Sequence, residues 1–412
     1  MNRNEVKKQD HPSGTPDRWK VLLATFVAYL YDSFDIIILA IAMPVLIKIL
    51  DITLPEGGLL ASATMIGAAI GSILLGVLAE NRGRKLALLV SLFLFGIGTG
   101  CVYLVHTWGQ WMILRFVTGI FIGGVWGPCV ALISTHWTLQ YRARAGAFIL
   151  STFAVGGIAA SFVGRLVLSV DWRVMFLVGA TSVFAGFYAW WAIPNDRPAS
   201  SEKKSESGVE KGKISLGSIL VGETGKRLVL ATLLNIFIMG AWWGSATWIP
   251  TFLSKERGLS LTMMANFSVF MYIGMFFGYQ FFGYVGDHLG RKKALMFSFL
   301  TCIVSIPVYI LISNGVFLFW WGMVVGFGYG GPFGIVGAFF AELFPERVRA
   351  LAGGFCFNVG RIGAVVAPFT VGVLGKMYGL QMGLLMASCM SAIGLFVLLF
   401  LPETAGVTDL KK

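Results

Sequence analysis

Charged residues are scarce in this sequence. They make up 13% of its 412 residues, whereas about a quarter of the residues in a typical soluble domain are charged. Hydrophobic residues make up 57%, and a water-soluble chain could not hide that much apolar surface. The composition excludes a soluble enzyme, a disordered protein and a secreted disulfide scaffold. It indicates a protein that crosses a membrane several times.

Histidine and cysteine are also scarce, and their placement argues against metal chemistry. The four histidines lie in tails, loops or a helix end, and no group of His, Cys or Ser converges in mid-membrane. The five cysteines fall in apolar runs, without CxxC or metal-ligand spacing. The polar N-terminus lacks the apolar region of a secretory signal. We expect no metal, no cofactor, no enzymatic activity and no cleaved signal peptide.

Long apolar runs recur along the whole chain. A helix that crosses the bilayer needs about 20 mostly apolar residues, and twelve runs reach this length. Strands of a transmembrane barrel would be about ten residues long and alternating, so helices are predicted. The predicted spans are residues 21–47, 57–79, 86–105, 109–133, 145–169, 173–194, 228–252, 264–286, 294–313, 315–341, 350–374 and 380–402.

A polar segment divides these spans into two sets of six. It is rich in Ser, Lys and Glu, which predicts a solvated linker. The expected organisation is a cytoplasmic tail (1–20), a six-helix bundle (21–194), a cytoplasmic linker (195–227), a second six-helix bundle (228–402) and a cytoplasmic tail (403–412).

The basic residues favour one side of the membrane. With both termini in the cytoplasm, 24 of the 32 Lys and Arg fall on the cytoplasmic side and five on the other. Lys and Arg are concentrated in the cytoplasmic loops of membrane proteins. The net charge of +12 is therefore explained by topology, and no nucleic-acid partner is predicted.

The two halves of the chain resemble each other at an offset of 207 residues. The pattern Gly-x-x-x-acid-x-x-Gly-Arg-Lys follows the second span and returns after the eighth, and glycines of the fourth span recur in the tenth. Two parallel six-helix bundles around a central site are one of the recurring plans of transporters. The two loops contain Glu80, Gly83, Arg84 and Lys85, and Asp287, Gly290, Arg291 and Lys292.

With these features the chain resembles the major facilitator superfamily over essentially its whole length. The repeated loop is similar to that family's signature loop, with Glu80 where Asp is more usual. Arg115 lies in a sequence similar to the family's fourth-helix motif. The resemblance implies an all-α membrane fold of two parallel six-helix bundles, transport by alternating access, and a gating role for both loops.

Two short runs point to a group within that family. Asp32-Ser33-Phe34-Asp35 resembles the Asp-Gly-x-Asp pattern of aromatic acid:proton symporters, with Ser33 in place of Gly. The run that contains Arg361 is similar to one found in the same group and in sialate and lactate:proton symporters. The resemblance implies an organic acid as substrate and a proton as the coupling ion.

Five charged residues lie inside predicted spans, namely Asp32, Asp35, Arg115, Arg165 and Arg361. A charge at a helix centre costs about 2.5–3.5 kcal/mol, so each is expected to pair or to face a wet cavity. Asp32 and Asp35 share a helix face, and two such close carboxylates cannot both ionise cheaply in a poorly solvated site. We predict that this pair carries the proton. The alternative is a structural ion pair with Arg115.

Arg361 is predicted to bind the substrate. It has no charged counterpart in the first half, and its planar guanidinium can bind a carboxylate through two hydrogen bonds. The alternative is a latch between the bundles. Arg165, near the outer end of its span, is expected to reach the interface. The other predicted binding residues are Asn358, Arg115, Tyr31, Asn235, Trp243 and Tyr329.

The tryptophan doublet at 242–243 carries a further expectation. Adjacent residues of a helix diverge by about 100°, so at most one of Trp242 and Trp243 is expected to face the cavity.

The sequence thus predicts a secondary transporter of a bacterial inner membrane, with both termini cytoplasmic. Its predicted activity is proton-coupled symport of a small organic anion, a carboxylate, by alternating access. Its expected partners are this anion, the proton and the lipid bilayer, and one chain is expected to function as a monomer. The alternatives are efflux of amphipathic compounds by proton antiport and a non-transporting nutrient sensor.

Overall fold

The computed structural model describes residues 17–137, 139–196 and 222–404. The predicted tails and most of the predicted linker lie outside these residues. The helices are α1 (Arg18–Ile49), α2 (Leu54–Arg82), α3 (Arg84–Gly100) with a 3₁₀ turn (Cys101–Leu104), α4 (Trp108–Ile122), α5 (Trp126–His136), α6 (Leu139–Val167), α7 (Arg173–Ala180), α8 (Ser182–Ala192), α11 (Gly222–Lys255), α12 (Leu261–Leu289), α13 (Arg291–Leu311), α14 (Gly315–Leu343), α15 (Arg349–Tyr378) and α16 (Leu380–Leu399).

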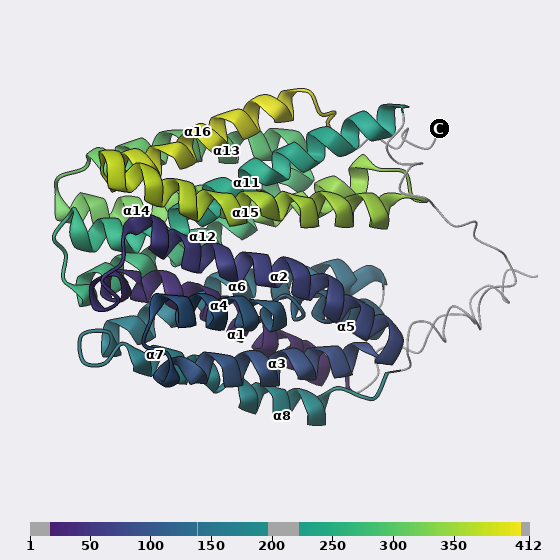
Figure 1. Ribbon diagram of the computed structural model, residues 1–412. Coiled ribbons are helices and arrows are strands. Elements are labelled where there is room, and N and C mark those ends of the chain that lie inside the picture. The colour runs from purple at the N-terminus through teal and green to yellow at the C-terminus, as the bar shows by residue number, and fades with distance from the viewer. Residues whose placement is uncertain (1–16, 138, 197–221, 405–412) are drawn as a thin grey trace, which may run out of the picture.

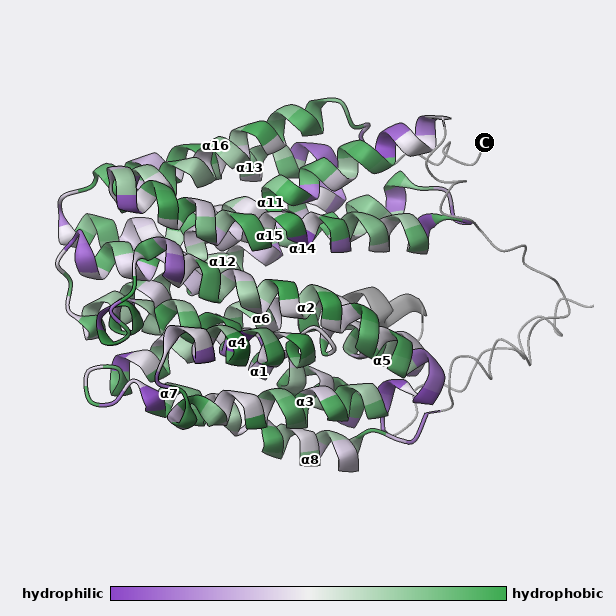
Figure 2. Ribbon diagram, in the orientation of Figure 1, coloured by the Kyte–Doolittle hydropathy of each residue, from purple (hydrophilic) through white to green (hydrophobic). Residues whose placement is uncertain are grey.

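These helices form twelve candidate membrane spans, in which α4 with α5 and α7 with α8 each make one. Figure 1 shows two groups of helices, α1–α8 and α11–α16. Across the boundary, α2 packs against α15, α6 against α12 and α1 against α11. Hydrophobic residues run along the helices, and hydrophilic ones collect near their ends (Figure 2). The predicted fold of twelve helices in two bundles is confirmed.

Close helix crossings also repeat between the halves. A Cβ atom added to Gly71 or Gly119 would collide with a backbone carbonyl where α2 crosses α4. The same holds for Gly278 and Gly326, each 207 residues later, where α12 crosses α14. Small residues permit such close approach of helices in lipid. The sequence repeat is therefore a repeat of packing.

Two of the predicted spans are interrupted. The span predicted over 109–133 breaks between α4 and α5, and the span over 173–194 breaks at Thr181, between α7 and α8. At the first break, a Cβ on Gly123 would collide with the carbonyl oxygen of Ala68 on α2. The break also precedes Pro128, the third residue of α5, which has no N–H to donate to the carbonyl oxygen of Gly124.

Candidate functional site

A cavity of about 500 Å³ lies between the two bundles, a volume typical of small-molecule sites. It extends from the middle of the helices toward the ends of α5 and α14 and the start of α15, where exposed Arg349 lies. Its wall is mostly apolar. Aromatic rings contribute much of that wall, among them Trp126, Phe153, Trp242, Trp243, Tyr279 and Phe333.

The opposite end of the molecule is closed by contact between α2 and α15. Ser62 Oγ donates a hydrogen bond to the carbonyl oxygen of Val365, at 2.6 Å. Farther along, Gly58 lies so close to α15 that an added Cβ would be 2.5 Å from the carbonyl oxygen of Pro368. Backbone-to-backbone approach of this kind leaves no space for a solute between these helices.

Asp32 and Arg361 reach the cavity from opposite bundles. Asp32 on α1 is 6% exposed and makes no ion pair within the described chain. Arg361 on α15 is close enough to interact with it electrostatically. One nitrogen of Arg361, Nη1, donates to the carbonyl oxygen of Ala68 on α2, at 2.9 Å, and its guanidinium lies 5.7 Å from the ring centroid of Phe357. Arg361 therefore both lines the cavity and bridges the bundles.

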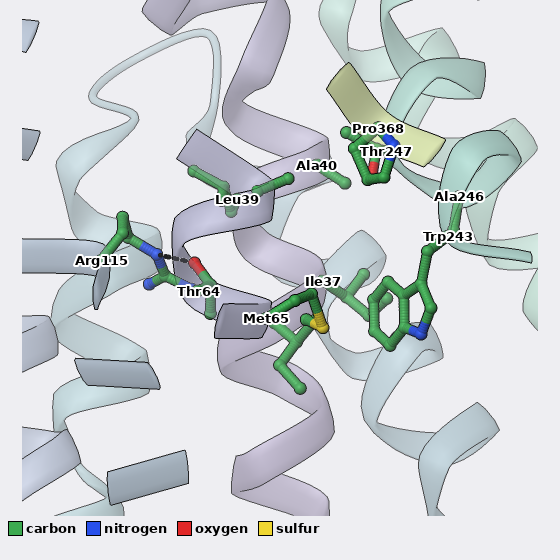
Figure 3. A pocket seen from close by; sticks show the side chains of 12 residues that line it. Ile37, Leu39, Ala40, Thr64, Met65, Arg115, Trp243, Ala246, Thr247 and Pro368 are labelled. Carbon is green, nitrogen blue, oxygen red and sulfur yellow. Dashed lines mark hydrogen bonds between the residues drawn. The ribbon is translucent and has the colours of Figure 1, made fainter. Parts of the chain in front are cut away.

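Asp35 and Arg115 are paired inside the first bundle. Arg115 Nη1 lies 3.1 Å from Asp35 Oδ2, and neither side chain is more than 2% exposed. Thr99 donates to the other oxygen of Asp35, and Arg115 Nε donates to Thr64 Oγ1 at 3.1 Å (Figure 3). Neither residue lines the large cavity; Arg115 instead borders a separate void of about 20 Å³, together with Trp243. This geometry is that of the structural ion pair considered as the alternative.

Only one of the other predicted binding residues lines the cavity. Trp243 lines the cavity. Asn358 is exposed, and its side chain accepts a hydrogen bond from Ser72 Oγ on α2, at 3.3 Å, outside the cavity wall. Three more are hydrogen-bonded within their own bundles: Tyr31 to Thr181 (2.8 Å), Asn235 to the carbonyl of Cys356 (3.1 Å) and Tyr329 to Ser245 (2.5 Å).

The sequence reasoning missed several cavity residues. Tyr29 lies one helical turn before Asp32 on the same face of α1, and this spacing is the signal that could have identified it. Tyr279 faces the cavity from α12. Both Trp242 and Trp243 line it, so the expectation that at most one would is wrong. The cavity is wide enough for both of these adjacent α11 side chains to form part of its wall.

The two loops predicted to act in gating have the same backbone geometry. Gly83 ends α2 and caps α3 with φ of 106°, and Gly290 caps α13 with φ of 113°. Such positive values favour glycine. In the second half Arg291 pairs with both Asp287 and Glu342.

A carboxylate also holds each loop to the end of the last span of its own half. Asp196 accepts from the backbone N–H of Arg84 at 2.5 Å and of Lys85 at 3.2 Å. Glu403, which lies 207 residues after Asp196, accepts from the N–H of Lys292 at 3.1 Å. A negative charge at a helix N-terminus is favourable, so each acid stabilises the start of the helix that follows the loop.

Comparison with known proteins agrees with this architecture. A putative metabolite transport protein from Haemophilus influenzae is 30% identical over 398 residues, which cover 94% of this chain and 97% of that protein. The cis,cis-muconate transport protein of Acinetobacter baylyi is 27% identical, with 93% and 95% covered. The xylose transporter XylE from E. coli has the same fold, with a TM-score of 0.77 at 15% identity over 96% of this chain and 100% of that one.

The model of the Major Facilitator Superfamily matches residues 21–281 and 267–412. Fold, repeat and relatives agree that this is a multi-pass integral membrane protein and not an enzyme. The chain belongs to the Major Facilitator Superfamily.

Proposed function

We propose that this protein is a proton-coupled symporter of a small organic anion, which binds through a carboxylate at Arg361 while Asp32 carries the proton. One observation carries the proposal: an arginine from one bundle and an aspartate from the other line a single cavity, and the aspartate forms no ion pair within residues 17–137, 139–196 and 222–404. The relative from Acinetobacter baylyi is named for transport of cis,cis-muconate, which supports an organic acid as substrate.

The cavity wall favours a flat acid. The ring of Trp242 lies edge-on to those of Phe153 and Phe333, with centroids 6.2 and 6.3 Å away. Aromatic side chains prefer stacked or edge-to-face contacts with other π systems. An unsaturated or aromatic carboxylate would place its charge at Arg361 and its body against these rings.

Electrostatics couples the anion to the proton. When Asp32 is ionised, its negative charge offsets the positive charge of Arg361 and repels an incoming anion. When Asp32 is protonated, the anion meets the full charge of Arg361 in a site of low dielectric constant, where charges interact strongly. Anion and proton therefore bind together, which is the requirement for symport.

The closed and open ends support alternating access. The cavity opens toward the end that carries the two Gly-Arg-Lys loops, and the concentration of Lys and Arg there supports a cytoplasmic position for this end. In the proposed cycle this is the inward-open state. Separation of α2 from α15 near Gly58 and Ser62 would open the other end.

Uptake into proteoliposomes that contain a pH-sensitive dye tests the proposal. Flat carboxylates such as muconate, benzoate and nicotinate are added outside, and lumenal acidification is compared with that of protein-free liposomes, which report passive diffusion of the neutral acids. We expect Arg361→Ala to abolish the protein-dependent signal. Asp32→Asn should still bind the anion, with an affinity that no longer depends on pH, but should carry no proton.

Arg165→Ala is the matched control, because Arg165 is an exposed arginine outside the cavity wall; it should behave as the wild type. If no acid in a broad panel acidifies the lumen beyond protein-free liposomes, in protein shown to be folded, anion symport is refuted. Acid-independent proton release that follows an amphipathic compound would indicate antiport instead.

A further inference from the structure

We propose that the hydroxyl of Tyr29 is the group with which the first bundle binds the carboxylate of the transported anion. The inference rests on the proposed function. It extends the site from a single arginine on the second bundle to a carboxylate held by both bundles.

The first bundle offers few groups that can bind an anion. Its arginine in mid-membrane, Arg115, is already bonded to Asp35 and Thr64 and does not line the cavity. Asp32 is only an acceptor while ionised, and in the protonated state of the proposed symport its single O–H holds the proton that is carried. Among the cavity-lining residues of this bundle, the remaining side-chain donors are the hydroxyl of Tyr29 and the indole of Trp126.

Tyr29 is the better placed of these two donors. It lines the same cavity as Arg361, Asp32 and Tyr279 and lies one helical turn from Asp32 on α1, so its side chain belongs to the polar part of the cavity wall. Its ring lies 4.9 Å from that of Trp126, centroid to centroid, which fixes the plane of the phenol. The hydroxyl has no hydrogen-bond partner in the part of the chain that the structure describes.

This arrangement has a consequence for transport. A carboxylate has two oxygens, so it can accept from Arg361 on α15 and from Tyr29 on α1 at once. The anion then links the two bundles whose relative movement opens and closes the pathway. An uncharged carboxamide would gain less from both donors, because hydrogen bonds to charged groups are the stronger ones.

Equilibrium binding to the purified full-length protein in detergent tests the inference. Radiolabelled benzoate and muconate are the probes, and the matching carboxamides are competitors. Tyr29→Phe removes the hydroxyl and keeps the ring, and we expect it to weaken carboxylate binding about 10-fold or more, since a hydrogen bond to a charged group is worth about 1.5–3 kcal/mol. Carboxamide binding should change less than about threefold.

Tyr31→Phe is the matched control. Tyr31 is two residues away on α1, but its hydroxyl bonds to Thr181 inside the bundle, so carboxylate binding should stay within about twofold of the wild type. A structural role for Tyr29 would instead weaken acid and amide equally and would overturn the inference. If Tyr29→Phe does not fold, Tyr29→His and Tyr29→Ala are compared instead. The histidine ring keeps a hydrogen-bond donor, so Tyr29→His should bind acids better than Tyr29→Ala.

Failure of the inference is distinguishable from failure of the proposed function. If the wild type binds no carboxylate, the proposed function fails. If the wild type binds carboxylates and Tyr29→Phe binds them equally well, the function stands and the role of Tyr29 is refuted.

Discussion

Substitution of the two aspartates of α1 should affect different properties, the stability of the fold for one and proton coupling for the other. Asp35 is fully buried and is bonded to Arg115 and Thr99. Asp32 lines the cavity and makes no ion pair with any residue that the structure describes. We therefore predict that Asp35→Ala destabilises the fold, whereas Asp32→Asn removes proton coupling and leaves the fold almost as stable as the wild type.

The magnitude follows from the burial of Arg115, which has only 2% of its side chain exposed. Removal of one partner of a buried ion pair leaves an uncompensated charge and costs about 3–5 kcal/mol. For a unit of about 150–250 residues, each kcal/mol lowers Tm by about 2–4 °C, so Asp35→Ala should lower Tm by on the order of 10 °C. Asp32→Asn should cost less than about 1 kcal/mol.

Thermal unfolding in detergent can be followed with a thiol-reactive fluorogenic dye, because Cys129 is buried in the first bundle and becomes reactive on unfolding. The double variant Asp35→Ala/Arg115→Met removes both charges and should recover most of the lost stability. If Asp35→Ala unfolds within about 2 °C of the wild type, the pair is not structural, and Asp35 becomes a candidate proton carrier again.

Two further predictions concern packing. Gly58→Ala should destabilise the closed end by about 1–3 kcal/mol, because its Cβ would be 2.5 Å from the carbonyl oxygen of Pro368. A cysteine engineered at that end should then react faster with a thiol reagent. In the control Gly76→Ala, where no described atom lies within 4 Å of the added Cβ, the cysteine should react as in the wild type. Asp196→Ala removes the acceptor for the first N–H groups of α3 and should lower stability by about 1–2 kcal/mol, visible as a lower Tm; an unchanged Tm would show that the cap contributes nothing.

The fold could be predicted because a membrane restricts the choices so strongly. Backbone groups in lipid must be satisfied internally, so an apolar run of sufficient length is a helix. The repeat then gave the two-bundle plan. The breaks at Gly123 and Thr181 were not predicted, although the sequence carries a signal for the first: Pro128 has no N–H to donate to the carbonyl oxygen of Gly124, four residues earlier.

The site was predicted only in part, because the sequence identifies charges in the membrane more readily than it identifies their partners. Asp32 and Arg361 both line the cavity, which agrees with the positions expected of a proton-carrying residue and a substrate-binding residue. Residues three apart on a helix still differ by about 60° in direction. On α1, Tyr29 and Asp32 differ by about 60° and both line the cavity, whereas Asp35, about 120° from Tyr29, points into the bundle. Tyr31 lies about 160° around the helix from Tyr29 and bonds to Thr181 inside the bundle.

The candidate site lies where the two halves differ. In α6 and α15 the repeat has an offset of 204 residues, which aligns Val155-Gly156-Gly157-Ile158 with Val359-Gly360-Arg361-Ile362. Where the second half has Arg361, the first half thus has Gly157, and a Cβ there would collide with the ring of Tyr272 on α12. The first half thus has a glycine that leaves space for a ring of the second half, and the second half has a cation in the cavity at the corresponding position. The acids of the second half that the structure describes lie at helix ends, so the nearest mid-membrane acid for Arg361 is Asp32 of the opposite bundle. In the proposed mechanism, movement of the bundles changes the distance between these two charges, which ties the protonation of Asp32 to the conformation.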